Sequence, residues 1–481
     1  MVTDSARFLR LSLFCAIIFL PMPAAAQPNA ELIVTCPADI AAASLNGAPV
    51  VVSYSVTTSG GIAPVTVTGS PASESGFAVG TTPVQVTARS SDGQMASCGF
   101  SVTVISSPLP SSIGAGPQAT ITCPAGAVEI VPGNDTIQSF VDVFPGVTTF
   151  CLKAGVHTLI RSITPKTGNT FVGEYGAILD GTAWVTSDGT QAAFRAHNQD
   201  IDYVTIRNLV IRNMPQRAIH AYYDMPDHWT IEYNEIVANY AGIVFSSYSQ
   251  IRNNYIHHNS YSGYMGERSS FSTFENNEIA YNGWDQKVSE SANVTFRNNF
   301  VHHNAGGGIW YDSDNTDALV EGNLVEDNGA AGIWFEIGSG AIIRNNIVRR
   351  SGETGVFIST SKNANVYNNT LEDNFRGITY FVNCPSVGAG AISFDLANNA
   401  AHDNTITLGT QAGAFASVFN YSNCTSAQAA PYVSGLKNLT FFQNTYHVPS
   451  PTSGQYWYWY VVKSWNEWQA LQQDLTSTVS E

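Results

Sequence analysis

The feature that most constrains the fold of this chain is an internal repeat that begins near residue 200. Each repeat contains an asparagine followed two positions later by an aliphatic or similar residue. These anchor residues are Asn208, Asn234, Asn254, Asn277, Asn299, Asn323, Asn346 and Asn369, then less regularly Asn404 and Asn444. From Asn208 to Asn369 the spacings are 26, 20, 23, 22, 24, 23 and 23 residues. A period of about 23 residues with strand-like patterning indicates a solenoid with one coil of three short strands per repeat.

The coils must stack, because no single coil can bury its inward side alone. A glycine follows most anchors after eight or nine residues, at Gly242, Gly263, Gly308, Gly332, Gly355 and Gly377. The repeats resemble those of the pectate-lyase-like superfamily of right-handed parallel β-helices, most strongly over residues 200–380. The resemblance implies an all-β chain with a right-handed parallel β-helix over residues 121–447.

Short helical patterns flank the repeats. Residues Ile137–Val143 read as an amphipathic helix that closes the N-terminal end of the β-helix. Residues 448–481 are predicted to form a C-terminal cap, with a helix at Trp465–Leu471. The anchor asparagines are interpreted as an internal ladder of stacked side-chain amides.

The first 26 residues have the pattern of a secretory signal peptide. Arg7 and Arg10 precede an apolar run, and the small residues Ala24–Ala26 form a cleavage site. The apolar run is too short for a membrane-spanning helix, and no later segment offers a longer one. We therefore expect a secreted protein, located outside the cell, in a periplasm or at the cell surface.

Residues 30–107 alternate apolar and polar positions in short runs, which predicts a small β-sandwich. This segment resembles the hyalin-repeat (HYR) family: Cys36–Ile40 opens the match, Phe77–Val84 lies in its middle, and Ser97–Val104 ends it. The resemblance implies an immunoglobulin-like interaction module with a protein or glycan partner. Residues 108–120 are predicted to be a linker, because Ser, Pro and Gly dominate there.

Six cysteines lie beyond the signal peptide, and an even number suits disulfides in an oxidising compartment. Sequence alone allows fifteen pairings. The six fall into three pairs, each confined to its own stretch of chain. We therefore predict disulfides between Cys36 and Cys98, Cys123 and Cys151, and Cys384 and Cys424.

The charge of the chain excludes one class of partner. The formal net charge is −16, with only 21 Lys plus Arg, and no basic stripe is present. Nucleic acid is therefore an unlikely ligand, because its phosphates need clustered cations. An acidic polysaccharide would require local positive charge at its binding site.

Acidic residues recur at one position of the repeat. Counted from the anchor, the thirteenth residue is Glu267, Glu290, Asp312 and Glu336 in four consecutive coils, and then Ser359. Equivalent residues of stacked coils lie about 4.8 Å apart, so this spacing predicts a ladder of carboxylates. A solvated charged face is the alternative, although directly stacked like charges destabilise a sheet.

Strand alternation sorts the neighbours of these acids. Ile309 and Ile333 are predicted to point inward, and Trp310 and Trp334 outward beside the carboxylates. Asp314 falls on the same outward face as Asp312. The prediction is an acidic groove with an aromatic wall.

Lys287 does not fit this count. Strict counting puts it at an inward position, so we expect its coil to contain a loop that brings Lys287 to the groove edge. There it could pair with the acids or hold a carboxylate of a substrate, and a plain surface salt bridge is the alternative.

The groove predicts an enzyme that cleaves glycosidic bonds of a polysaccharide, because a hydrolase needs one carboxylic acid and one carboxylate. The candidate catalytic residues are Asp312, Asp314, Glu336 and Glu290. The candidate substrate-binding residues are Trp310, Trp334, Asn315, Lys287 and Glu267.

Two other functions remain open. One is a lyase on a uronic-acid polymer, in which Asp312, Asp314 and Glu336 hold Ca²⁺ and Lys287 or an arginine accepts the proton; the sequence establishes no cofactor. The other is a non-catalytic carbohydrate-binding or cell-surface adhesion protein with a rigid β-helix. The HYR-like module favours the adhesion protein.

Overall fold

The computed structural model describes residues 30–37, 39–44, 49–52, 54–106, 115–185, 189–222, 226–382, 395–408, 416–420, 424–448 and 456–480. The predicted signal peptide and Cys384 lie outside these residues. Contacts divide the chain into two compact units: residues up to 102 form the first, except 41–50 and 77–80, which group with residues 103–481 in the second.

Residues 33–106 form a small β-sheet region. Its strands are β1 (Ile33–Thr35), β2 (Ile40–Ser44), β3 (Val50–Val52), β4 (Thr57–Ser59), β5 (Thr66–Ser70), β6 (Ser75–Phe77), β7 (Gly80–Arg89) and β8 (Met95–Ser106). The largest sheet has the order β2-β8-β7-β5, and β5 pairs with β7 in the antiparallel sense. A disulfide joins Cys36 to Cys98, as predicted.

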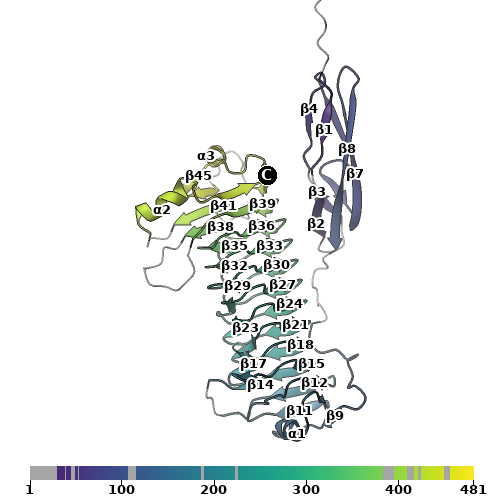
Figure 1. Cartoon of the computed structure of the whole chain (residues 1–481), viewed down its shortest axis with the longest axis vertical. Coiled ribbons are helices and arrows are strands. Elements are labelled where there is room, and N and C mark those ends of the chain that lie inside the picture. Colours follow the sequence, from purple (N-terminus) through teal and green to yellow (C-terminus); the bar gives the residue numbers. More distant parts are fainter. Residues whose placement is uncertain are drawn as a thin grey trace, which may run out of the picture. The chain divides into compact units, whose positions relative to one another are not determined.

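The second unit is a solenoid of parallel coils, and its strands form three long sheets (Figure 1). The first sheet contains β9 (Val128–Ile130), β10 (Thr149–Leu152), β12 (Thr170–Gly173), β15 (Thr205–Arg207), β18 (Thr230–Glu232), β21 (Gln250–Arg252), β24 (Thr273–Glu275), β27 (Thr295–Arg297), β30 (Leu319–Glu321), β33 (Ile342–Arg344), β36 (Asn365–Tyr367), β39 (Asn399–His402) and β42 (Leu439–Phe442).

The second sheet contains β11 (Gly155–Thr158), β13 (Ala177–Asp180), β16 (Val210–Arg212), β19 (Glu235–Val237), β22 (Tyr255–His257), β25 (Glu278–Ala280), β28 (Phe300–His302), β31 (Leu324–Glu326), β34 (Ile347–Arg349), β37 (Thr370–Glu372), β40 (Thr405–Thr407), β43 (Thr445–His447) and β46 (Thr478–Ser480).

The third sheet contains β14 (Ala192–His197), β17 (Arg217–Tyr222), β20 (Ala241–Phe245), β23 (Ser262–Glu267), β26 (Lys287–Ser289), β29 (Ile309–Tyr311), β32 (Ile333–Glu336), β35 (Thr354–Ser359), β38 (Arg376–Val382), β41 (Ala416–Asn420), β44 (Trp457–Trp459) and β45 (Val461–Lys463). The predicted all-β architecture is therefore confirmed. The first and second sheets also continue upstream of residue 200, where the repeat is hard to see in the sequence.

One aliphatic and aromatic core runs through the coils. Ile309, Ile333 and Val356 stack in register and are completely buried, as the alternation predicted. Stacking the coils removes these inward faces from water, which supplies most of the driving force for the fold.

The anchor asparagines from Asn234 onward form the predicted ladder, whereas the amide of Asn208 donates to the Gly173 carbonyl and accepts from Gln118. The amide Nδ2 of each donates to Oδ1 of the next, at about 3.0 Å, from Asn234 through Asn254, Asn277, Asn299, Asn323, Asn346, Asn369 and Asn404 to Asn444. A second ladder, not predicted from the sequence, joins Asn239, Asn259, Asn282, Asn304 and Asn328 at the next turn. Each amide also donates to a backbone carbonyl, so these buried polar groups are satisfied.

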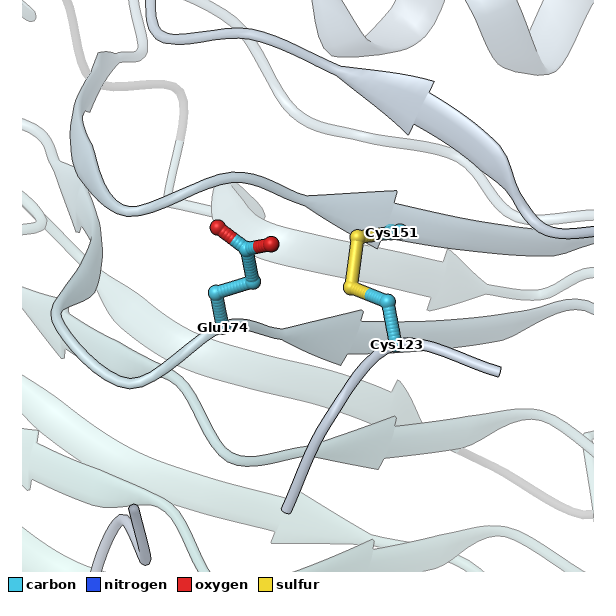
Figure 2. Close-up of side chains that lie close together, drawn as sticks. All are labelled: Cys123, Cys151 and Glu174. Carbon is cyan, nitrogen blue, oxygen red and sulfur yellow. A yellow bond between two sulfur atoms is a disulfide. The ribbon is translucent and has the colours of Figure 1, made fainter. Parts of the chain in front are cut away.

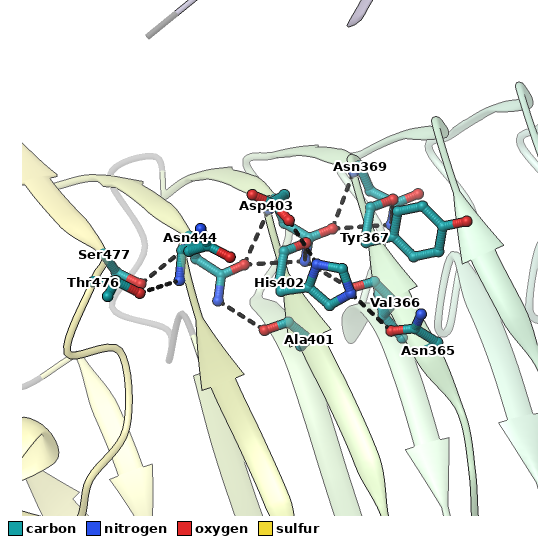
Figure 3. Close-up of polar contacts among 12 residues, drawn as sticks. Asn365, Val366, Tyr367, Asn369, Ala401, His402, Asp403, Asn444, Thr476 and Ser477 are labelled. Atoms are coloured by element: carbon teal, nitrogen blue, oxygen red, sulfur yellow. Dashed lines mark hydrogen bonds and ion pairs between the residues drawn. The ribbon is translucent and has the colours of Figure 1, made fainter. Parts of the chain in front are cut away.

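The last rungs of the first ladder lie beside a stack of rings at the C-terminal end (Figure 3). The imidazole of His402 stacks between the rings of Tyr367 and Phe442. Beyond them Asn444 donates to the buried carboxylate of Asp474 at 3.0 Å. Tyr446, Trp468 and Ser477 also donate to this carboxylate, so the ladder ends on an acceptor with several donors.

Helices close the solenoid. Helix α1 (Ile137–Val143) lies at the N-terminal end with the predicted bounds. Helix α2 (Ser426–Val433) and α3 (Trp465–Ala470) belong to the C-terminal end, where α3 buries Trp468. No helix among the described residues is long and apolar enough to cross a membrane.

The second predicted disulfide, between Cys123 and Cys151, is confirmed and fixes the entering segment to β10. Cys424 is also disulfide-bonded. Its predicted partner Cys384 lies outside the described residues, so that pairing stays a prediction.

Asn299→Ala should destabilise the β-helix by about 2 kcal/mol or more, because it leaves buried donors and acceptors of neighbouring coils without partners. The side chain of Asn299 is completely buried and bonds to Phe274 and Asn323. Gln250→Ala, which removes an exposed amide from β21, should change stability by less than about 0.5 kcal/mol. Urea unfolding followed by circular dichroism compares the two, and equal effects would contradict a stabilising role of the ladder.

Candidate active site

The candidate site lies on the outward face of the third sheet, where β23, β26, β29, β32 and β35 stack in order. Glu336 ends β32, and Asp312 directly follows β29. Tyr311 pairs with Phe335, so the next residues, Asp312 and Glu336, are neighbours on adjacent coils. Adjacent parallel strands are about 4.8 Å apart, which places these two residues side by side, as the count from the anchors predicted.

The predicted ladder of four carboxylates is wrong at Glu290. Glu267 pairs with Ser289, and Val288 pairs with Tyr311, so Ser289 occupies the place between Glu267 and Asp312. Glu290 falls in the following turn, with positive φ, and forms an ion pair with Arg268 at 2.8 Å.

The reason is a turn that is one residue shorter in this coil. Gln286 occupies the inward place taken by Ile309 in the next coil, and it is completely buried. Its amide donates to the carbonyls of Gly307 and Gly308. Lys287 therefore points outward, opposite Met265 in the register, without the loop that the sequence suggested.

Lys287 lies in the middle of the site. Its Nζ is 3.0 Å from Asp312 Oδ2 and 3.5 Å from Asp285 Oδ1, and 5.1 Å from the centre of the Trp310 ring. Partial burial disfavours the charge of Lys287, but the hydrogen bond and the charge of Asp312 outweigh it and raise the pKa of the ammonium. Lys287 is thus a cation that pairs with Asp312.

Glu336 has a different environment. Burial raises the pKa of Glu336 to about 7, and the negative charge of Asp312 adds to this effect. Weaker opposing contributions come from the Ser359 hydroxyl, the Trp310 indole and the charge of Lys287. The Ser359 hydroxyl donates to Oε1 of Glu336 at 3.3 Å. Near neutral pH Glu336 is therefore partly protonated, beside an ion-paired Asp312.

The aromatic wall is present but more enclosed than predicted. The rings of Trp310 and Trp334 stack at 4.5 Å with an interplanar angle of 12°. Trp310 is only 9% exposed, whereas Trp334 is half-buried and continues to Phe357. Trp334 therefore offers more surface to a ligand than Trp310 does.

Asp314 and Asn315 lie in the turn after Asp312. Burial raises the pKa of Asp314, and the charges of Glu290 and Asp312 raise it further. Asn315 is only 1% exposed, and its amide donates inward to the Val288 carbonyl at 2.9 Å. Its predicted place as a substrate contact is therefore corrected, because this side chain belongs to the interior of the turn.

Two residues of the site were not selected from the sequence. The hydroxyl of Tyr261 donates to Asp285, and Asp285 lies beside Lys287. Glu267, which was selected, accepts a hydrogen bond from Tyr222 of β17. A contact across coils between a turn residue and a strand residue has no periodic signal in the sequence.

A three-residue ligand set occurs at one place among the described residues. The sulfurs of Cys123 and Cys151 and a carboxylate oxygen of Glu174 lie within 4.8 Å of one another (Figure 2). The sulfurs are joined in a disulfide, and Glu174 pairs with Lys153, so this set is not a metal site. Nothing in the structure tests the Ca²⁺ site suggested at Asp312, Asp314 and Glu336, so it stays a prediction.

Several solved structures resemble this chain to different degrees. The A-module of mannuronan C-5 epimerase AlgE6 from Azotobacter vinelandii is 16% identical, with a TM-score of 0.51, over 72% of this chain and 94% of that one. The A-module of AlgE4 from the same organism is 15% identical, with a TM-score of 0.47, over 74% and 98%. A family 28 exopolygalacturonase from Yersinia enterocolitica is 11% identical, with a TM-score of 0.39, over 90% and 87%.

At 16% identity, the likeness to the AlgE6 A-module shows a shared fold and nothing more. No curated protein matches the chain in sequence. Residues 192–336 and 287–460 match the family described as right handed beta helix region, and together they span more than half of the chain. The chain therefore belongs to the right-handed β-helix family.

Proposed function

We propose that the protein is a polysaccharide hydrolase in which Glu336 is the general acid and Asp312 the nucleophile. The observation that carries this proposal is the contrast between two neighbouring carboxyl groups. Burial makes Glu336 a proton donor near pH 7, while Asp312 is paired with a cation. Two carboxyl groups with separated protonation states are what glycoside hydrolysis requires.

In the proposed reaction Glu336 gives its proton to the glycosidic oxygen as Asp312 attacks the anomeric carbon. The sugar–oxygen bond breaks and an ester to Asp312 forms. Glu336, now a carboxylate, takes a proton from water, and the resulting attack releases Asp312. Neighbouring residues of adjacent coils lie about 4.8 Å apart at the backbone, and the two carboxyl groups of retaining enzymes are roughly 5–5.5 Å apart, so we propose retention.

A lyase with Lys287 as the base is less well supported. A base must lose its proton before it can accept one, and the ion pair with Asp312 raises the pKa of Lys287. This favours hydrolysis over elimination by Lys287.

The fold and the cysteines fit this proposal. The A-module of AlgE6, which shares the fold, is a mannuronan epimerase and so acts on a polysaccharide. The two complete disulfides suit an exported protein.

A panel of polysaccharides, with and without EDTA, tests the function. We expect new reducing ends without the absorbance of unsaturated products, and no loss of activity in EDTA. Proton NMR of the first product should show retention. Unsaturated products would indicate a lyase, and binding without cleavage of any polymer would indicate a non-catalytic protein.

The activity should fall as the pH rises above about 7. The general acid works in its protonated form, so kcat/KM should decrease as Glu336 loses its proton, about tenfold per pH unit well above its pKa. The same raised pKa means that folding is favoured by protonation of Glu336, and this contribution is lost as the pH rises from about 4.5 to about 7. A pH–rate profile with no descending limb between pH 6 and 9 would contradict the assignment of Glu336.

A further inference from the structure

The arginines of the β-helix differ in whether they have a counter-charge. Most form an ion pair with a carboxylate: Arg161, Arg207, Arg212, Arg252, Arg268, Arg297, Arg344, Arg349 and Arg350. Arg195 of β14 and Arg217 of β17 form none with any carboxylate that the structure describes. These two arginines belong to adjacent strands of the third sheet, the sheet that carries the candidate active site.

Both guanidinium groups bond only to neutral acceptors in the described part of the chain. Arg195 donates to the carbonyl and the hydroxyl of Thr190, at 3.1 and 3.2 Å. Arg217 donates to the carbonyl of Gly189 at 2.6 Å. A guanidinium has five N–H donors in a fork that matches a carboxylate or sulfate, so each arginine keeps donors for a ligand.

Among the carboxylates that the structure describes, none pairs with Arg195 or Arg217, and both side chains are half-buried. Burial lowers the pKa of Arg217, because it disfavours the charged form. The imidazole of His220, only 3% exposed, contacts the Thr190 carbonyl, to which Arg195 also donates. Burial lowers the pKa of His220 to about 3, and the charges of Arg217, His197 and Arg195 lower it further. Half-buried charges without a partner cost free energy, which an anion bound from outside would offset.

A continuous row of groups connects this pair with the active site. The phenols of Tyr240 and Tyr261 lie close enough to Arg217 to act on its pKa, and their rings stack at 5.0 Å. Tyr261 donates to Asp285, which lies beside Lys287. Strand β17 is four strands from β29 in the sheet, a distance of about 19 Å at the usual strand spacing. An oligosaccharide of several units would reach from Arg217 to Asp312.

We infer that Arg195 and Arg217 form a binding site for an anionic group of the polysaccharide, a carboxylate or a sulfate, and hence that the substrate is an acidic polysaccharide. The inference rests on the proposed function, since it names the substrate class of the same groove. Trp284, 54% exposed beside Asp285, offers a ring face for an intervening sugar.

Binding measured without turnover tests this site. We would titrate Glu336→Gln protein by calorimetry with three hexasaccharides: a uronate oligomer, a sulfated galactan oligomer and a neutral glucan oligomer. Adding Arg217→Gln or Arg195→Gln should weaken the better-bound anionic oligomer at least about tenfold and leave the neutral one unchanged. The uronate and sulfate arms identify which anion the site takes. Arg252→Gln, which removes an ion-paired arginine from β21, is the matched control and should change neither.

A second measurement distinguishes loss of the anion site from a folding defect. In Arg217→Gln protein the pKa of His220, followed by NMR, should rise, because one neighbouring positive charge is gone. Anionic oligomers that bind the arginine variants as tightly as the parent, or that do not bind the parent at all, would overturn the inference. Cleavage of neutral polymers alone would contradict the proposed anion site but agree with the proposed hydrolase activity. Arginine-dependent binding of anionic oligomers without cleavage of any polymer would support the anion site but contradict the proposed hydrolase activity.

Discussion

Glu336→Gln is expected to lower kcat about 100- to 10,000-fold, the range for loss of a general acid, while the protein stays folded. Glutamine keeps the shape of the side chain but cannot donate the required proton. Because burial raises the pKa of Glu336 to about 7, the ionised form destabilises the folded state at higher pH. The variant should therefore be equally or more stable at pH 8, by up to about 2 kcal/mol.

Initial rates and thermal unfolding of the same preparation check both parts of this prediction. Glu275→Gln is the control, because it neutralises a carboxylate of β24 in the first sheet, away from the candidate site. An active Glu336→Gln variant would exclude Glu336 as the acid. An inactive variant that also melts at a much lower temperature would make Glu336 a structural residue.

Asp312→Asn is expected to lower kcat by at least about 100-fold, because an amide is a poor nucleophile and a poor base. The variant should also move the alkaline limb of the pH profile to lower pH, because the charge of Asp312 contributes to the raised pKa of Glu336. Lys287 loses its closer partner but keeps Asp285 at 3.5 Å.

The stability of Asp312→Asn should change by less than about 1 kcal/mol, because the loss of one partly exposed ion pair is offset by relief of repulsion with Glu336. Kinetics at several pH values and a melting curve provide the test. A variant with lower kcat but an unmoved alkaline limb would show that Asp312 and Glu336 are not electrostatically coupled.

The sequence predicted the fold well because the β-helix repeats one local pattern. Anchors such as Asn299 and inward residues such as Ile309 recur with the coil, and each repeat confirms the others. The adjacency of Asp312 and Glu336 followed from the same count. Where the coil length is constant, the number of residues after the anchor asparagine determines where a side chain lies on the sheet.

Counting residues from the anchor asparagine gave wrong positions where a turn changed length. One missing residue before β26 reversed inward and outward positions, so Lys287 moved to the groove and Glu290 left the ladder. Alternation has a period of two, so a single deletion exchanges the two faces of a strand. Which described carboxylates pair with an arginine, and that none pairs with Arg195 or Arg217, depends on contacts between different coils, which no local pattern encodes.

The asparagine ladder also gives the β-helix a dipole moment along its axis. Each amide turns its oxygen toward the preceding coil and an N–H toward the following one, from Asn234 to Asn444. Aligned dipoles of this kind add up, as peptide dipoles do in an α-helix, and polarise one another. The column thus has its positive end at the last coil, where Asp474 supplies a negative charge. Without that C-terminal segment, the last coil would present donors and unpaired strand edges on which another molecule could stack.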